Sequence, residues 1–432
     1  MTIVTSLSWV PQGVAATQPI LNDITSSELT ELKQMVDGAS VDIDNSDDSD
    51  DQSSSNPGGM FYSANTQDPY ITEQVSDEDE IQNLHIPSSA YLLLAGRVNL
   101  PEREGFLEQW IVEPSSEDSY ATIDMHHDRV LRSAPICTQW IGHGEGNHPC
   151  HVAAVGFMEP GIELWNMNEV DALEPIAVLG PKKHLSISRK RIMKKKGIVS
   201  EKEKEPGHKG AVLGLSWNTV RQNFLASSGD DGKVFVWDLD KTEAPVWKIP
   251  SAFKHKKAVQ TVDWAPFSDS VIMTSSFDRT SKIFDLRQSG PPLSFKLEAE
   301  AESACWANIG QSLETSKFFI GCEDGSIQCF DPRDTSTRLY MIDAHKSSTH
   351  LNVHPRLPHL LVSGGSDKCL KAWNIGSEPK MLHKENVSSE VGEVFALQFN
   401  PFADENNIGL LAVGGSKDDL EIFDVASWKN VL

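Results

Sequence analysis

Tryptophan and other bulky apolar residues recur along the chain in two interlocked series, and this double period limits the folds that the chain can adopt. The first series ends short apolar runs at Trp9, Trp140, Trp217, Trp264, Trp306, Val353 and Phe399. The second closes β-like runs at Trp110, Trp165, Trp237, Phe284, Phe330, Trp373 and Phe423, most of them followed by Asp or Asn. Because each series has seven members, the sequence predicts seven copies of one structural unit.

A second repeated string lies between the two series, in which apolar residues give way to small residues and then to an acidic one. Asp231, Asp278, Asp324 and Asp367 each stand six residues before their aromatic, while Glu104, Glu159 and Lys417 take that place in the outer units. A period of about 40 to 45 residues that closes with Trp-Asp is typical of WD40 blades, which stack radially because a single blade cannot bury both of its faces. We therefore predict an all-β, seven-bladed WD40 propeller.

One unit is split by an acidic insertion. Trp9 and Trp110 are 101 residues apart, and residues 15–88 hold sixteen Asp or Glu against one Lys. So much charge with so few apolar residues predicts disorder. Leu7-Ser8-Trp9 matches Leu215-Ser216-Trp217, so we expect 1–14 to carry the inner strand of the first blade, 15–88 to be a disordered insertion, and 89–432 to complete the propeller.

Serines within the acidic insertion precede runs of acidic residues. Ser76 is followed by Asp77-Glu78-Asp79-Glu80, and Ser46 and Ser49 lie among five aspartates. An acid-directed kinase selects such serines, and each phosphate adds about −1.5 to −2 of charge. The sequence therefore predicts phosphorylation of Ser46, Ser49 and Ser76.

A basic loop, residues 181–206, separates the second unit from the third. Trp165 and Trp217 are 52 residues apart, whereas the other intervals of this kind run from 22 to 30. The surplus contains Lys182, Lys183, Arg189, Lys190, Arg191, Lys194, Lys195 and Lys196. Three interpretations stay open: a nuclear-import signal, an arm that contacts nucleic-acid phosphates, and a solvated loop with neither role.

Catalytic and metal-binding motifs find little support. In His126-His127-Asp128, neighbouring residues of a strand should point to opposite faces and so fail to converge on a substrate. His143, His148, Cys150 and His151 fit no zinc-ligand spacing, and neither Gly364-Gly365 nor Gly414-Gly415 precedes the Lys of a phosphate-binding loop. We expect no enzyme activity, cofactor, metal or small-molecule substrate.

The composition indicates a soluble intracellular protein. The six cysteines show no disulfide-framework spacing, which suits a reducing compartment, and the chain holds no long apolar run or leader. We expect no membrane contact.

Motifs along nearly the whole chain resemble the periodic tryptophan protein 1 family. The resemblance is carried, in chain order, by Leu7–Gly13, the acidic insertion, Leu107–Trp110, His126–Leu131, Phe157–Trp165 and the basic loop before Gly210–Leu213. It implies a nuclear and nucleolar WD40 protein needed for ribosome assembly, chiefly of the large subunit, and linked in animals to ribosomal RNA gene transcription and chromatin. It also implies a tail beyond Leu432.

Two classes of function remain. The first is a non-enzymatic scaffold, a monomer within a larger assembly, that binds pre-ribosomal proteins, ribosomal RNA, histones or chromatin. The second is a substrate receptor of a cullin-type ubiquitin ligase, because Phe284-Asp285-Leu286-Arg287 and Phe330-Asp331-Pro332-Arg333 resemble the adaptor-binding box of such receptors.

Overall fold

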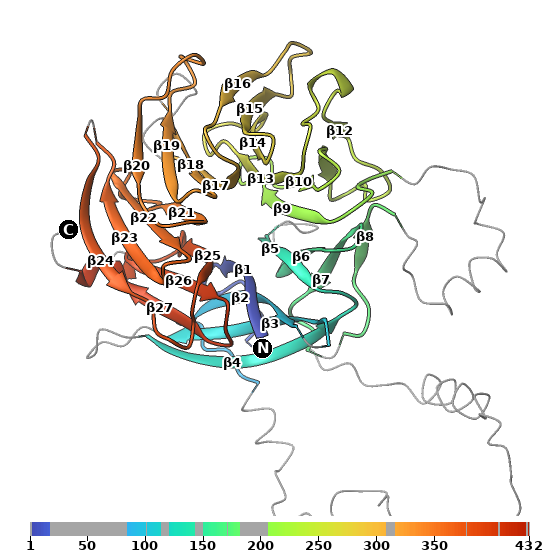
Figure 1. The fold of residues 1–432 in the computed structure, drawn as a ribbon. Coiled ribbons are helices and arrows are strands. Elements are labelled where there is room, and N and C mark those ends of the chain that lie inside the picture. The colour runs from blue at the N-terminus through green and yellow to red at the C-terminus, as the bar shows by residue number, and fades with distance from the viewer. Residues whose placement is uncertain are drawn as a thin grey trace, which may run out of the picture.

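The computed structural model describes residues 2–17, 84–100, 102–113, 121–142, 150–170, 172–181, 206–307, 316–376, 378–404, 407–428 and 431. These residues form seven antiparallel sheets arranged in a ring (Figure 1), and a channel lies at the centre of the ring. The prediction of a seven-bladed WD40 propeller is confirmed. Within the described ranges, no helix is long and apolar enough to cross a membrane.

Each blade runs outward from the channel in chain order. The innermost strands are β1 (Thr2–Val10), β5 (Pro135–Ile141), β9 (Val212–Trp217), β13 (Val259–Trp264), β17 (Ala301–Trp306), β21 (Thr349–Val353) and β25 (Val394–Phe399). The second strands are β2 (Tyr91–Asn99), β6 (Val152–Phe157), β10 (Phe224–Gly229), β14 (Val271–Ser276), β18 (Phe318–Cys322), β22 (Leu360–Gly365) and β26 (Leu410–Gly415).

The third strands are β3 (Glu104–Glu113), β7 (Ile162–Asn166), β11 (Val234–Asp238), β15 (Thr280–Asp285), β19 (Ser326–Phe330), β23 (Cys369–Asn374) and β27 (Leu420–Asp424). The outer strands are β4 (Thr122–Leu131), β8 (Ala177–Leu179), β12 (Trp247–Lys248), β16 (Leu293–Lys296), β20 (Tyr340–Asp343) and β24 (Lys380–Asn386). The first aromatic series therefore lies on the inner strands and the second on the third strands.

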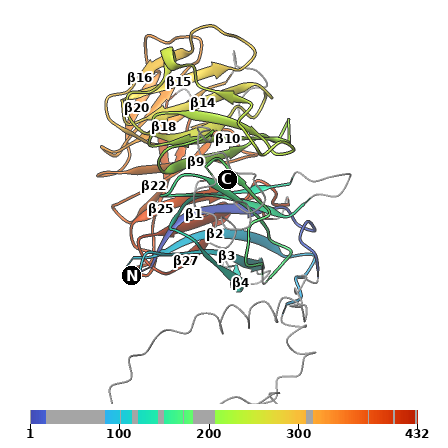
Figure 2. The same ribbon diagram turned by 90° about the vertical axis from the view of Figure 1, so that its right-hand side faces the viewer.

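Consecutive strands of a blade alternate in direction, so the two faces of the ring carry different loops. We call the face where the inner strands begin the entry face, and the face where they end the exit face; Figure 2 shows the ring from its side, with the start of β1 at the left. Connections from an outer strand to the next inner strand lie on the entry face, together with the turns between second and third strands. Connections from first to second strands lie on the exit face.

The inner strand β1 closes the ring between the first and last blades. It pairs with β2 from Thr2↔Asn99 to Val10↔Leu92, and it packs on β25 and β26 of the seventh blade. The backbone nitrogen of Trp9 donates to Gln398 Oε1 at 3.2 Å, and Trp9 Nε1 donates to the Gln398 carbonyl oxygen at 3.0 Å. Gly414 is required opposite β1, because a Cβ there would lie 2.4 Å from Val4 Cγ1.

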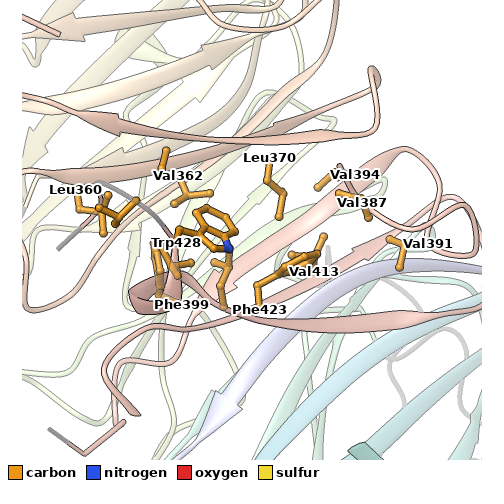
Figure 3. Close-up of a cluster of buried hydrophobic side chains, with 14 residues drawn as sticks. Leu360, Val362, Leu370, Val387, Val391, Val394, Phe399, Val413, Phe423 and Trp428 are labelled. Atoms are coloured by element: carbon orange, nitrogen blue, oxygen red, sulfur yellow. The ribbon is translucent and has the colours of Figure 1, made fainter. Parts of the chain in front are cut away.

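The seventh blade differs from the other six in having three strands among the described residues. Beyond β27 the chain forms a short 3-10 turn, η5 (Val425–Ser427), in which the Ala426 amide donates to Asp424 Oδ1 at 3.0 Å. Trp428 then stacks on His383 of β24, with ring centroids 5.0 Å apart, and meets Phe423 edge to face. Figure 3 shows Trp428 within the apolar cluster that joins the sixth blade to the seventh.

Replacing Trp9 with alanine should lower the free energy of unfolding by about 3 to 5 kcal/mol, because the side chain is 1% exposed and fills the junction of two blades. Urea unfolding of the purified chain measures the loss. The control replaces residues 18–83 with a short flexible linker, which should cost far less because loop-closure entropy changes slowly with length. Similar losses in the two variants would contradict the role of Trp9 in closure.

Candidate functional site

Entry-face loops of three blades are fixed by a buried histidine and an aspartate. In the third blade, His208 Nδ1 lies 3.2 Å from Asp231 Oδ1 and Nε2 lies 2.9 Å from Ser227 Oγ, which also accepts from Trp237 Nε1. The fourth and sixth blades repeat this unit with His255, Thr274 and Asp278, and with His345, Ser363, Asp367 and Trp373. In the fifth blade Asp324 accepts from the amide and hydroxyl of Ser326 instead.

These contacts keep the aspartates charged. Burial alone would raise the carboxyl pKa of Asp231 and Asp278, but hydrogen bonds from His208 and His255 outweigh it, so both pKa values lie well below the usual range. Burial lowers the pKa of His255 and His345, only partly offset by their aspartates. The loops are therefore rigid platforms for the residues that follow each histidine.

The first two blades use a glutamate and an arginine in place of this unit. Arg97 Nε lies 3.2 Å from Glu108 Oε1, and Trp110 Nε1 donates to Glu108 Oε2 at 2.9 Å. In the second blade Arg132 Nε lies 2.7 Å from Glu163 Oε1, and Trp165 Nε1 donates to Oε2 at 3.2 Å. Sequence reasoning missed both pairs, although each aromatic follows its glutamate by two residues.

Replacing Arg132 alone should lower the free energy of unfolding more than replacing both members of its ion pair with Glu163. Arg132→Met leaves the buried carboxylate of Glu163 without its cation and should destabilise the chain by about 3 kcal/mol, whereas Arg132→Met with Glu163→Met should recover much of that loss. Urea midpoints of the two variants make the comparison. A double variant no more stable than the single one would show that the pair has another role.

The expectation that His126 and His127 point apart is wrong. Gln109 pairs with His127 and Trp110 with Met125, so His126 is the extra residue of a β-bulge in β4. The bulge rotates its side chain, and the two Nδ1 atoms lie 2.7 Å apart. His126 Nε2 also contacts the Leu84 carbonyl oxygen at 2.9 Å. The pair thus anchors the segment that leads into β2.

Both charged insertions leave the ring from points where their two ends are held together. The Ile86 amide donates to the Thr17 carbonyl oxygen at 3.1 Å, beside the Ala16 amide, which donates to Asn168 Oδ1 at 2.8 Å. At the other insertion, a Cβ on Gly207 would lie 3.0 Å from the Gly180 Cα. The first pair of ends follows β1 on the exit face, and the second joins β8 to β9 on the entry face, so the insertions leave opposite faces.

Several predicted residues lie outside the described ranges. They are Lys182, Lys183, Arg189, Lys190, Arg191, Lys194, Lys195 and Lys196 of the basic loop, and Ser46, Ser49 and Ser76 of the acidic insertion. Among the described residues, no group of three or more His, Cys, Asp or Glu side chains is arranged to hold a metal ion.

The described entry face also carries lysines that directly follow the fixed histidines: Lys209, Lys256 and Lys346. All three side chains are exposed. Sequence reasoning did not single them out, yet the repeated dipeptides His208-Lys209, His255-Lys256 and His345-Lys346 signal them.

The two arginines of the ligase-adaptor hypothesis are bound within their own turns. Arg287 Nη2 lies 2.8 Å from Asp285 Oδ2 and its Nε donates to Oδ1 at 2.9 Å. Arg333 Nε likewise donates to Asp331 Oδ1 at 2.9 Å. Each guanidinium therefore stabilises the turn after its third strand.

The central channel encloses about 590 Å³ and is lined by the inner strands. Asp263 lies on this wall and accepts from Ser216 Oγ at 3.2 Å, which links the third and fourth blades. Burial raises the pKa of Asp263 to about 7, against weaker opposing hydrogen bonds from Ser216 and from the Trp264 and Trp306 amides.

The chain should lose stability through Asp263 as pH rises. Because its pKa is raised in the folded state, the folded protein binds this proton more tightly, so the stabilisation is complete below about pH 4 and lost as pH rises through about 7. In Asp263→Asn, the loss of unfolding free energy between pH 4 and 8 should be about 1 to 3 kcal/mol smaller than in the wild type. The magnitude is modest because the channel admits some solvent, which screens the charge. Urea unfolding between pH 4 and 8 tests this, and parallel profiles for variant and wild type would contradict it.

Comparisons with known proteins agree with this geometry. The WD domain, G-beta repeat model matches residues 201–238 and 336–374. The chain is 30% identical to the periodic tryptophan protein 1 homolog of Drosophila melanogaster over 73% of its length and 65% of that protein. It is 24% identical to periodic tryptophan protein 1 of Saccharomyces cerevisiae, over 84% of the chain and 68% of the yeast protein.

The chain is therefore similar to proteins of the periodic tryptophan protein 1 family along most of its length. It is also 29% identical to an uncharacterized WD repeat-containing protein of Schizosaccharomyces pombe, over 99% of the chain and 90% of that protein. The WD repeat match and the ring of blades identify a WD40 scaffold.

Proposed function

We propose that this WD40 protein is a non-enzymatic scaffold in nuclear and nucleolar ribosome biogenesis, acting in large-subunit assembly, ribosomal RNA processing or ribosomal RNA gene transcription. The observation that carries the proposal is the exit of two oppositely charged insertions from opposite faces of a rigid ring. The separation keeps the charges from neutralising each other. It lets the entry face approach RNA or DNA phosphates while the exit face approaches basic partners such as ribosomal proteins or histones.

The proposal keeps the division of the chain predicted from the sequence, although the structure packs Ile86, within the predicted insertion, into the core of the ring. Residues 1–14 contribute the inner strand of the first blade, 15–88 form the acidic arm, and 89–432 supply the remaining propeller with its basic loop at 181–206. The same basic residues, Lys182 to Lys196, also fit a nuclear-import signal. A ligase receptor is the less favoured reading, because Arg287 and Arg333 are already bonded to Asp285 and Asp331.

The full chain should sediment with precursors of the large ribosomal subunit in gradients of nuclear extract. Moderate salt should release it, because the proposed contacts with RNA and proteins are largely electrostatic. Small-subunit precursors from the same gradient are the control. Recovery in salt-resistant complexes with a ligase adaptor, and absence from the particles, would overturn the scaffold proposal in favour of the receptor.

Phosphorylation of Ser46, Ser49 and Ser76 should strengthen the binding of the acidic arm to basic proteins. Each phosphate adds about −1.5 to −2 of charge, which should tighten binding to a basic protein partner. Mass spectrometry of the chain from growing cells tests for the modification. Finding all three serines unmodified at full peptide coverage would rule out this form of regulation under those conditions.

A further inference from the structure

Four exposed basic side chains lie on the entry face of the third and fourth blades: Lys209, Lys254, Lys256 and Arg279. We call this set the basic arc. None of the four takes part in an ion pair with another residue that the structure describes. By contrast, Lys233 and Lys257 nearby are paired with Asp231 and Glu300. The arc is therefore free positive charge on a chain whose formal net charge is −24.

Two arc lysines are held in place through their backbones. The Lys209 amide donates to Asp231 Oδ2 at 3.3 Å, and the Lys256 amide donates to Asp278 Oδ2 at 2.9 Å. These carboxylates are the same ones that fix the buried histidines. The side chains consequently start from rigid positions and extend into solvent.

Arg279 occupies a backbone conformation that disfavours it. It follows Asp278 in the turn between β14 and β15 with a φ of 60°, in the left-handed region. In the third and fifth blades the residue after the corresponding aspartate is a glycine, Gly232 or Gly325, also at positive φ. Glycine would adopt this conformation without strain. Lys368 of the sixth blade has the same conformation, so Arg279 belongs to the arc because of its exposed charge and not because of the strain.

The arc continues the surface from which the basic insertion leaves. The insertion returns at Gly207, directly before His208 and Lys209. In the next blade, Lys254 Cε lies 3.1 Å from where a Cβ on Gly232 would stand, so the fourth-blade loop covers the third-blade turn. The arc therefore spans the entry-face loops of the third and fourth blades, which also carry the exposed carboxylate of Asp230.

Acidic residues of the fifth blade end this surface. Glu298, Glu300, Glu302, Glu323 and Asp324 all lie toward the entry face there. Glu300 forms an ion pair with Lys257, the last lysine of the fourth-blade loop, at 2.5 Å. The carboxylates separate the arc from Lys346 and Lys368 of the sixth blade.

We propose that the basic arc binds the phosphate backbone of RNA; this inference rests on the proposed function and names described residues of its RNA site. A protein partner of standard size would need an apolar centre. Among the described residues, however, no large exposed apolar side chain lies on the entry face of the third or fourth blade, since Val220 and Val246 belong to exit-face loops. Phosphates need only positioned cations.

The sixth blade offers a matched control for the fourth. Lys346 follows its histidine as Lys256 does, and Lys368 has a φ of 59° at the turn position of Arg279. The test variant, called the fourth-blade variant, is Lys256→Ala with Arg279→Gly. The control, called the sixth-blade variant, is Lys346→Ala with Lys368→Gly. Both glycine substitutions relieve the same backbone strain, so neither variant should be less stable than the wild type by urea unfolding.

The experiment measures binding of the full purified chain to a mixed-sequence single-stranded RNA of about 30 nucleotides, between about 50 and 300 mM KCl. The fourth-blade variant should bind about tenfold more weakly or worse at 0.1 M salt, and its log–log salt slope should fall by about 1.4, at about 0.7 for each of two lost phosphate contacts. The sixth-blade variant should stay within about twofold of the wild type. Polyglutamate should compete poorly.

A third variant separates this inference from the proposed function: neutralisation of Arg189, Lys190, Arg191, Lys194, Lys195 and Lys196. Loss of RNA binding in that variant with wild-type binding in the fourth-blade variant would overturn the arc and leave the proposed function standing. Equal losses in the fourth-blade and sixth-blade variants would also overturn it, since only bulk charge would then matter. Competition by polyglutamate as strong as by RNA would overturn the assignment to nucleic acid. If the wild type did not bind RNA, the proposal that the arc binds RNA would be wrong. The proposed function would still be tested separately, by sedimentation with large-subunit precursors.

Discussion

Every blade of this ring depends on its two neighbours for the burial of its apolar faces. The second strands β14, β22 and β26 are buried along their whole length, because blades cover them on both sides. Small residues near the axis allow that approach, as Gly414 does against Val4. A rigid wheel results, whose loops can differ in charge without disturbing the packing between blades.

The repeated aromatics made the fold predictable from the sequence because they recur at a regular spacing. Trp217, Trp264 and Trp306 all end inner strands, so the number of blades and the order of their strands followed from counting. The same spacing revealed both insertions as departures from it. Features that repeat once per blade are therefore within reach of sequence reasoning.

Features that depend on a local irregularity were not within reach. The convergence of His126 and His127 needs one residue more in β4 than in β3, and no periodicity announces a bulge. The partners of Glu108 and Glu163 come from different places, Arg97 within β2 and Arg132 after β4, so no common spacing marks them. The basic arc lay in between: its His-Lys dipeptides repeat, but its strained Arg279 became visible only through a backbone angle.

The contact between Trp9 and Gln398 joins residues 389 positions apart, and this separation bears on the order of folding. Blades two to six pack on neighbours made shortly before or after them, so they can form in sequence during synthesis. β1 emerges first, yet one of its two neighbouring blades is made last. The apolar face of β1 that packs on the seventh blade therefore stays exposed until the seventh blade has left the ribosome. Closure of the ring is then a late folding step that depends on long-range contacts.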